Sequence, residues 1–212
     1  MGRYVVGITG ASGGAYARAT LRGLLAAGHE VVCVVSDAGR RVIDLELGLR
    51  LSGAAEADEE RLRGSLGLPD ATGLRLIDHR DVGAAIASGS YQVNGMAIVP
   101  CSTGTLGRIA NGVSSSLIER AADVALKERR RLVLVPRETP LSLVHLRNMV
   151  AVTEAGAIVL PASPGLYHRP ESIDDLVDSI AGRVLAHLGV DTPLLKSWEG
   201  GAPQAFAGLE EL

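Results

Sequence analysis

The sequence has only two cysteines, Cys33 and Cys101, and aromatic residues make up only 3% of its 212 positions. Both cysteines lie in or beside apolar, strand-like runs, so we expect neither a disulfide framework nor a cysteine-rich zinc site. The formal net charge is −3. Because the chain has neither a basic field for phosphate backbones nor an aromatic surface for stacking bases, nucleic acid is not an expected partner.

A long hydrophobic run is also missing. No apolar stretch approaches the roughly 20 residues that a membrane-spanning helix needs, although hydrophobic residues make up 47% of the chain. The first residues show neither the basic region nor the cleavage site of a signal peptide. We therefore expect a cytoplasmic protein with no membrane partner.

Lysine is the third scarce residue type, since Lys127 and Lys196 are the only two in the chain. A single ammonium among many guanidinium groups is a compact, mobile point charge, which suits ligand binding. Chance placement on a solvated helix face explains Lys127 equally well at this point.

Short β-branched runs alternate with longer stretches of helical period, which predicts a parallel sheet with helices on both faces. The expected fold class is a single-domain Rossmann-like (flavodoxin-like) α/β fold over residues 1–189, with a C-terminal tail over 190–212. The expected strands are 3–9, 30–36, 74–77, 96–100, 132–136 and 157–161. The expected helices are 14–27, 38–47, 113–129, 140–154 and 173–188, with a peripheral helix inside 47–73. Ser172, three residues before Asp175, predicts a capping box at the start of the last helix.

Ligands bind outside the carboxyl ends of the strands in such a sheet, so the loops at that edge are the first candidates for a binding site. The loop 7–14 is rich in glycine and leads into a helix whose free amides attract anions such as phosphate. It is not a P-loop, because no Gly-Lys-Ser/Thr follows. It partly matches a dehydrogenase fingerprint, but Tyr16 replaces the last glycine. Asp37, just after the second strand, keeps NAD(P) binding open as an alternative, and a purely structural turn is another.

Two further loops at this edge carry polar side chains. The fourth strand ends in Ser102-Thr103-Gly104-Thr105, whose hydroxyls suit phosphate or the edge of a heterocycle, although an unspecific Ser/Thr turn would also explain them. The sixth strand leads to Tyr167, which could hydrogen-bond an anion. The neighbouring His168 is an available acid or base, or simply a loop histidine. Arg183 is expected on the inner side of the last helix.

Several charged residues are candidates for binding a second anion. Arg120 and Lys127 are seven residues apart on a predicted helix, so both should emerge on one side and could hold a dianion. The alternative is that Lys127 pairs with Asp123. Arg137 and Glu138 lie between prolines at the end of the fifth strand. A guanidinium beside a carboxylate there suits a phosphate clamp with an acid next to it, and a local ion pair is the alternative.

One more acid, Glu46, lies near the carboxyl end of the second predicted helix, where it slightly opposes the helix dipole. It is either a functional residue or an ordinary surface acid. No spacing of His, Asp and Glu in the sequence indicates a metal site.

Taken in order, six segments resemble the UbiX/Pad-type flavin prenyltransferases, within the superfamily of homo-oligomeric flavin-containing cysteine decarboxylases. They are 7–13, 87–90, 100–105, 117–130, 132–141 and 167–170, and the likeness runs from about residue 3 to 188. The resemblance implies an enzyme that joins the dimethylallyl group of dimethylallyl phosphate to N5 and C6 of reduced FMN. It also implies that FMN is a substrate, that no metal is needed, that a UbiD-type decarboxylase receives the product, and that the chain forms a homo-oligomer, expected to be a dodecamer.

The resemblance also implies roles for individual residues. FMN would be held by Gly10, Ala11, Ser12, Ser36, Ser102, Thr103, Gly104, Thr105 and Arg137. Dimethylallyl phosphate would be bound by Ser90 from a neighbouring subunit and by Arg120, Lys127, Arg137, Glu138, Tyr167 and Arg183. The implied catalytic residues are Glu138 and Glu46 as proton handlers, Ser12 as a hydrogen-bond partner near flavin N5, and Lys127 as a cation for the departing phosphate.

Two rival functions stay open. FMN-dependent cysteine decarboxylases share the fold and the flavin, but they carry a Pro-x-Met-Asn-x-x-Met-Trp motif that this sequence lacks; the nearest approach is 147–149. A non-catalytic flavin-binding or delivery protein would bind FMN without needing Glu138.

Overall fold

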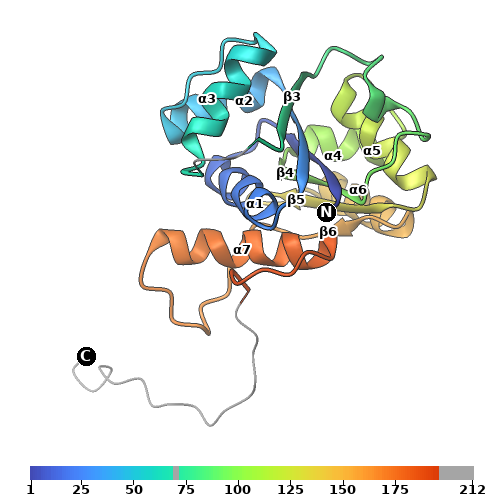
Figure 1. The fold of residues 1–212 in the computed structure, drawn as a ribbon. Helices are drawn as coiled ribbons and strands as arrows, with labels where there is room; N and C mark the ends of the chain where they lie inside the picture. Colours follow the sequence, from blue (N-terminus) through green and yellow to red (C-terminus); the bar gives the residue numbers. More distant parts are fainter. Residues whose placement is uncertain (69–71, 196–212) are drawn as a thin grey trace.

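The computed structural model describes residues 1–68 and 72–195. Within these residues, six parallel strands form one sheet in the order β3-β2-β1-β4-β5-β6 (Figure 1). This is the strand order of a doubly wound Rossmann-like fold, with the switch point between β1 and β4, so the predicted fold class is confirmed. The strands are β1 (Arg3–Ile8), β2 (Glu30–Val35), β3 (Leu74–Asp78), β4 (Gly95–Cys101), β5 (Arg131–Pro136) and β6 (Ile158–Val159).

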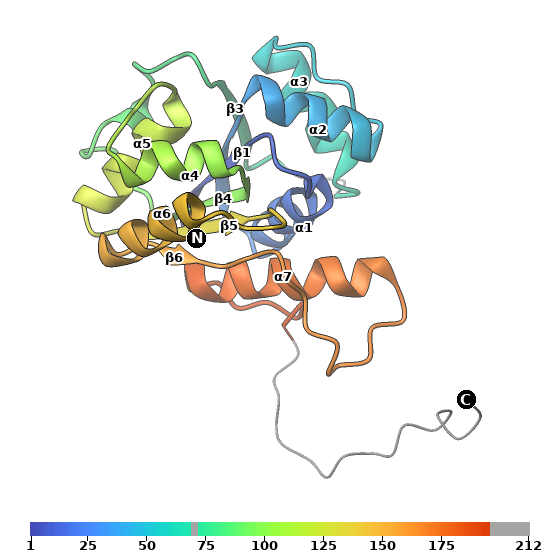
Figure 2. The ribbon, with the colours of Figure 1, turned by 180° about the vertical axis from the view of Figure 1, so that it is seen from behind.

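Helices cover both faces of the sheet (Figures 1 and 2). One face carries α1 (Gly14–Ala26) and α7 (Ile173–Leu188), which pack against each other. The opposite face carries α4 (Thr103–Ala110), α5 (Leu117–Lys127) and α6 (Leu143–Glu154). Near the β3 edge lie α2 (Asp37–Leu47) and α3 (Ala55–Ser65), and the short 3-10 helix η1 (Ala85–Ala87) packs against α5.

Side chains of the strands alternate between two apolar layers, as strands buried on both faces require. In β1, Tyr4, Val6 and Ile8 join the layer of α1 and α7, whereas Val5 joins the layer of α4 and α5. Because both layers are apolar, the polar groups that could bind a ligand are confined to the ends of the strands.

Helix α6 begins later than the sequence predicts. The hydroxyl of Ser142 accepts the amide of His145 at 3.3 Å, and Nδ1 of His145 accepts the amide of Ser142 at 3.3 Å. This reciprocal pair satisfies two amides that a helix start leaves free. The prediction of a helix from Pro140 is therefore wrong, and α6 starts at Leu143.

Two other differences lie between β4 and β5. Ser102 accepts the amide of Thr105 and caps α4, a helix that the sequence analysis had treated as a turn. The predicted start of α5 at Val113 is wrong as well. Gly112 has a φ of 67°, which interrupts helical backbone, and α5 begins only at Leu117.

The chain stays attached to the domain beyond α7. Gly189 ends the helix in the left-handed conformation, Val190 is buried in the layer of α1 and α7, and Leu194 packs against that layer. The rest of the predicted tail, 196–212, lies outside the described residues. The peripheral helix expected inside 47–73 is α3. Among the described helices, none is long and apolar enough to cross a membrane.

The capping box predicted for α7 is confirmed, and it generates a stability prediction. The hydroxyl of Ser172 accepts the amide of Asp175 at 3.1 Å, and the Asp175 carboxylate accepts the amide of Ser172 at 3.0 Å. We expect Ser172→Ala to lower the free energy of unfolding by about 1 kcal/mol, measured by urea denaturation. Ser114→Ala, on an exposed loop, is the control. Equal stability of the two variants would contradict the capping role.

Candidate active site

The loop after β1 brings the amino end of α1 next to the carboxyl end of α2. The Glu46 carboxylate accepts the amide of Gly13 at 3.0 Å and that of Gly14 at 2.7 Å. Gly13 has a φ of 138°, and a Cβ there would lie 2.9 Å from the ring of Tyr16, so this turn requires glycine. The sequence predicts that free amides at this helix start attract an anion such as phosphate, and the anion at the positive end of α1 is the Glu46 carboxylate.

Arg137 reaches back from the end of β5 to the same loop. Its Nε donates to the carbonyl oxygen of Ser12 at 3.2 Å. Tyr16 in α1 interacts electrostatically with both Arg137 and Glu46. Burial raises the pKa of its hydroxyl, Arg137 opposes that shift, and Glu46 adds to it. The structure thus brings Ser12, Glu46 and Arg137 together with Tyr16, which the sequence analysis noted only as a missing glycine.

Glu138 is exposed and lines a hollow of about 240 Å³, which we call the Glu138 hollow, together with Arg137, Leu141 and Met149. The carboxylate accepts the amide of Thr139 at 3.1 Å. Among the ion pairs of the described residues, none joins Glu138 to Arg137, so the alternative of a local ion pair is wrong. The carboxylate lies at the wall of a hollow with the apolar neighbours Leu141 and Met149.

A larger hollow of about 510 Å³, which we call the Ser36 hollow, opens where β1, β2 and β4 end. Ser36 caps α2 by accepting the amide of Gly39 at 3.0 Å. The hydroxyls of Ser102 and Thr105 lie 3.0 Å apart in the first turn of α4. Buried Thr9 ties β1 to β4, because it donates to the Pro100 carbonyl at 2.8 Å and accepts the amide of Ser102 at 2.7 Å. Two helix starts and several hydroxyls therefore face one space.

The other residues predicted for FMN lie around this hollow or next to it. Gly10 lines it, and the absence of a Cβ there lets Ala38 of α2 approach to 2.5 Å from the ideal Cβ position. Ala11 is buried, and Thr103 and Gly104 form the first turn of α4.

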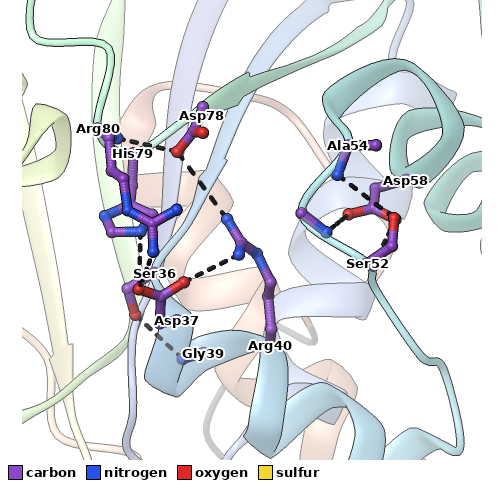
Figure 3. Close-up of polar contacts among 11 residues, drawn as sticks. Ser36, Asp37, Gly39, Arg40, Ser52, Ala54, Asp58, Asp78, His79 and Arg80 are labelled. Atoms are coloured by element: carbon purple, nitrogen blue, oxygen red, sulfur yellow. Dashed lines mark hydrogen bonds and ion pairs between the residues drawn. The ribbon is translucent and has the colours of Figure 1, made fainter.

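The Ser36 hollow also has a charged side, which Figure 3 shows. The Asp37 carboxylate lies 2.9 Å from Arg40, 2.7 Å from Arg80 and 3.3 Å from Nε2 of His79. Partial burial alone raises the pKa of Asp37, but His79 and the two arginines outweigh it and lower that pKa. Because two guanidinium groups already engage this carboxylate, it is poorly placed to accept a ribose diol, which disfavours the NAD(P) alternative.

On the other side of the same hollow, Arg108 pairs with Glu119 at 2.8 Å. Glu119 is only 3% exposed, and its carboxylate also lies 3.2 Å from the hydroxyl of Ser115. Burial raises the pKa of Glu119, but hydrogen bonds from Ser116, Arg108 and Ser115 outweigh that effect and lower it. The sequence analysis missed this pair, because its members are eleven residues apart on two helices.

Ser90, Arg120 and Lys127 form a separate group. Arg120 donates to the carbonyl of Ala87 at 3.2 Å, and Nζ of Lys127 lies 2.8 Å from the ideal Cβ position of Gly89. Both cations therefore face the segment before Ser90, as their seven-residue spacing predicts.

Arg120 and Lys127 each form an ion pair with a nearby carboxylate. Asp123 pairs with Arg120 at 2.7 Å, and Lys127 pairs with Glu128. The alternative in which Lys127 pairs with Asp123 is therefore wrong.

Tyr167 and Arg183 line a third hollow, of about 310 Å³, together with His168 and Asp178. The prediction that Arg183 lies on the inner side of α7 is wrong, because its side chain is exposed at the rim of this hollow. Nε2 of His168 is buried without a hydrogen-bond partner in the described structure.

The described residues contain no group of three or more His, Cys, Asp or Glu that could hold a metal ion. Burial raises the pKa of both Cys33 and Cys101 to about 12, so neither thiol is poised as a nucleophile.

Comparison with known proteins places these features in a family. The model of the family described as Flavoprotein matches residues 2–185. A flavin prenyltransferase UbiX from Synechocystis sp. is 46% identical over 199 residues, which cover 93% of this chain and 96% of the relative.

Two solved structures are similar in fold and sequence. AnUbiX (PadA1), solved in complex with FMN and dimethylallyl pyrophosphate, has a TM-score of 0.83 at 38% identity, over 94% of this chain and 98% of that one. A dodecameric FMN-dependent UbiX-like decarboxylase from Escherichia coli O157:H7 has a TM-score of 0.80 at 36% identity, over 93% and 100% of the two chains. The chain therefore belongs to the Flavoprotein family and, within it, to the UbiX-type flavin prenyltransferases.

Proposed function

We propose that the protein transfers a dimethylallyl group from dimethylallyl phosphate to N5 and C6 of reduced FMN. The observation that carries the proposal is the meeting of Ser12, Glu46 and Arg137 at one loop, beside a hollow walled by Glu138. A relative of 46% identity is named flavin prenyltransferase, and a structure of 38% identity holds FMN together with a dimethylallyl donor. The flavin is then a substrate, and the protein needs no metal.

The chemistry sets clear demands on the site. N5 forms a bond to the allylic carbon while the bond from that carbon to the phosphate oxygen breaks, and the phosphate leaves with the electron pair. The N5 proton is lost, the alkene is then protonated, and C6 adds to the resulting cation and loses its proton as the ring closes. Cations must stabilise the leaving phosphate, and carboxylates must move protons. We assign the first task to Lys127, Arg137 and Arg183 with Tyr167, and the second to Glu138 and Glu46.

One chain cannot bring all these residues together. Lys127 lies before the start of β5 and Glu138 just after its end, and a six-residue strand spans about 20 Å. We therefore propose that Lys127 reaches the site from a neighbouring copy of the chain, together with Ser90 and Arg120. The residues implied for dimethylallyl phosphate form one pocket only in an oligomer.

The surface of α6 fits such an assembly. Only Val152 of this helix is buried, whereas Leu143, Val144, Leu146 and Val150 are exposed apolar side chains. An apolar helix face of this kind marks an interaction surface. A second copy of the chain is its proposed partner, since the UbiX-like decarboxylase of 36% identity is dodecameric.

Two further proposals follow from the assigned reaction. Prenylated FMN would pass to a decarboxylase of the UbiD type, and the enzyme would work in the cytoplasm, where its unpaired cysteines stay reduced. A cysteine decarboxylase is the weaker alternative, because the sequence lacks the methionine-asparagine motif of those enzymes.

The direct test is anaerobic incubation of the protein with reduced FMN and dimethylallyl phosphate, followed by mass analysis of the released flavin. We expect a flavin that has gained one five-carbon unit, together with free phosphate. Release of unmodified FMN under conditions in which FMN binds would favour the non-catalytic flavin-binding alternative.

Glu138→Gln tests the proposed proton handling. The amide keeps the shape of the carboxylate but cannot accept a proton, so we expect turnover to fall at least about 100-fold while the Kd for FMN stays unchanged. Glu154→Gln, at the end of α6, is the matched control and should keep full turnover. If Glu138→Gln turns over like the unaltered protein, Glu138 has no part in the mechanism.

Val144→Asp tests the proposed role of α6. Val144 is 63% exposed, so a charge there should leave the isolated chain folded but prevent its burial against a second copy. For Val144→Asp we expect light scattering to show a smaller assembly, and we expect the prenylation activity to be lost. Val144→Leu should keep the full oligomer size and the prenylation activity. An unchanged mass for Val144→Asp would show that α6 is not an interface.

A further inference from the structure

The proposed FMN substrate carries a phosphate, and the structure leaves it no place at the glycine loop. In Rossmann-like folds that position is the amino end of the first helix. Here the amides of Gly13 and Gly14 already donate to the Glu46 carboxylate. A second anion at this helix start would be repelled by that carboxylate, so the phosphate needs other donors.

The Ser36 hollow offers such donors. Ser36 and Ser102 cap α2 and α4, so the positive ends of two helices open on the same space. The hydroxyls of Ser36, Ser102 and Thr105 are short, fixed hydrogen-bonding groups at its wall. The glycine loop borders the hollow through Gly10, so a flavin next to Ser12 could extend its phosphate arm into it.

Of the two arginines that line this hollow, one is already neutralised. Arg108 is bound to the buried carboxylate of Glu119 at 2.8 Å and lies 3.2 Å from the hydroxyl of Thr105. Moving it toward a ligand would leave the buried Glu119 carboxylate without its cationic partner, which is costly. Arg108 therefore supports the hollow and has little charge to offer.

Arg80 is different. Its side chain is 64% exposed, and Asp37, which it contacts at 2.7 Å, is shared with Arg40 at 2.9 Å (Figure 3). Asp78 lies 4.0 Å from Arg40, and His79 approaches Asp37 at 3.3 Å. Asp37 is thus shared between two guanidinium groups, and Arg40 would remain as its partner if Arg80 turned to a ligand.

We propose that Arg80 binds the phosphate of FMN in the Ser36 hollow and so makes the protein select FMN over riboflavin. This inference rests on the proposed function, because it takes the flavin to be the ligand. An arginine fork matches the oxygens of a phosphate in a bidentate manner, and the exposed side chain can turn from Asp37 to the ligand without leaving a buried charge behind.

The test compares the binding of FMN and of riboflavin to the intact protein, by fluorescence quenching. For Arg80→Gln we expect the affinity for FMN to fall about tenfold, the size of one charge-assisted hydrogen bond, and the affinity for riboflavin to stay the same. Arg41→Gln removes the same charge from the exposed surface of α2 and should change neither. Melting temperatures of both variants serve to confirm that they fold.

The outcomes separate this inference from the proposed function. Suppose that the unaltered protein prenylates FMN and that Arg80→Gln binds FMN in preference to riboflavin as strongly as the unaltered protein does. The assignment of Arg80 is then overturned and the proposed function stands. An equal loss of affinity for FMN and for riboflavin would show that Arg80 acts only on the structure of the protein, and it would also overturn the assignment of Arg80 to the phosphate. If the unaltered protein binds neither flavin, both the proposed function and this inference fail.

Discussion

The site depends on the contact between the Glu46 carboxylate and the amides of Gly13 and Gly14. It joins the carboxyl end of α2 to the amino end of α1 and fixes the loop that carries Ser12. It also neutralises the one helix start that this kind of fold commonly uses for phosphate. Because that position is filled from within the chain, a phosphate-bearing flavin must direct its charged end elsewhere.

The second constraint is the length of β5. Parallel strands place all their carboxyl ends at one edge, so the loops after β1, β2, β4 and β5 can cooperate within a chain. Lys127, at the end of α5, lies at the opposite edge. We therefore propose an oligomer in which one copy supplies the flavin loop and Glu138, and another supplies Lys127. The apolar surface of α6 is a physical reason for such copies to associate.

The structure agrees with the predictions from sequence where the signal is local. Runs of β-branched residues predicted the first five strands to within one residue at each end, because both faces of the sheet are buried, and Ser172 with Asp175 predicted the start of α7. The sixth strand, predicted over 157–161, is shorter and spans only Ile158–Val159. The predictions from sequence were wrong where a turn-like composition obscured the start of a helix. The Ser-Thr-Gly composition after β4 predicted a turn, although Ser102 caps a helix there.

Sequence could not reveal contacts between distant positions. Arg108 and Glu119, or Asp37 and Arg80, meet only because the fold brings separate loops to one edge. Arg183 was misplaced for a related reason. It lies between the buried Ile180 and Val184 along the chain, yet the rotation of α7 turns it outward. Tyr16 drew no attention as a functional residue, although it lies near Glu46 and Arg137.

Complementation between two inactive variants can detect a prenyltransferase site that is shared between copies of the chain. Glu138→Gln and Lys127→Ala should each be inactive alone. When the two variants are co-expressed and assemble together at random, about one quarter of the sites should combine an intact Glu138 with an intact Lys127. We expect the mixed oligomer to regain about that fraction of the prenylation activity. A mixture as inactive as either variant, at full oligomer size, would contradict it.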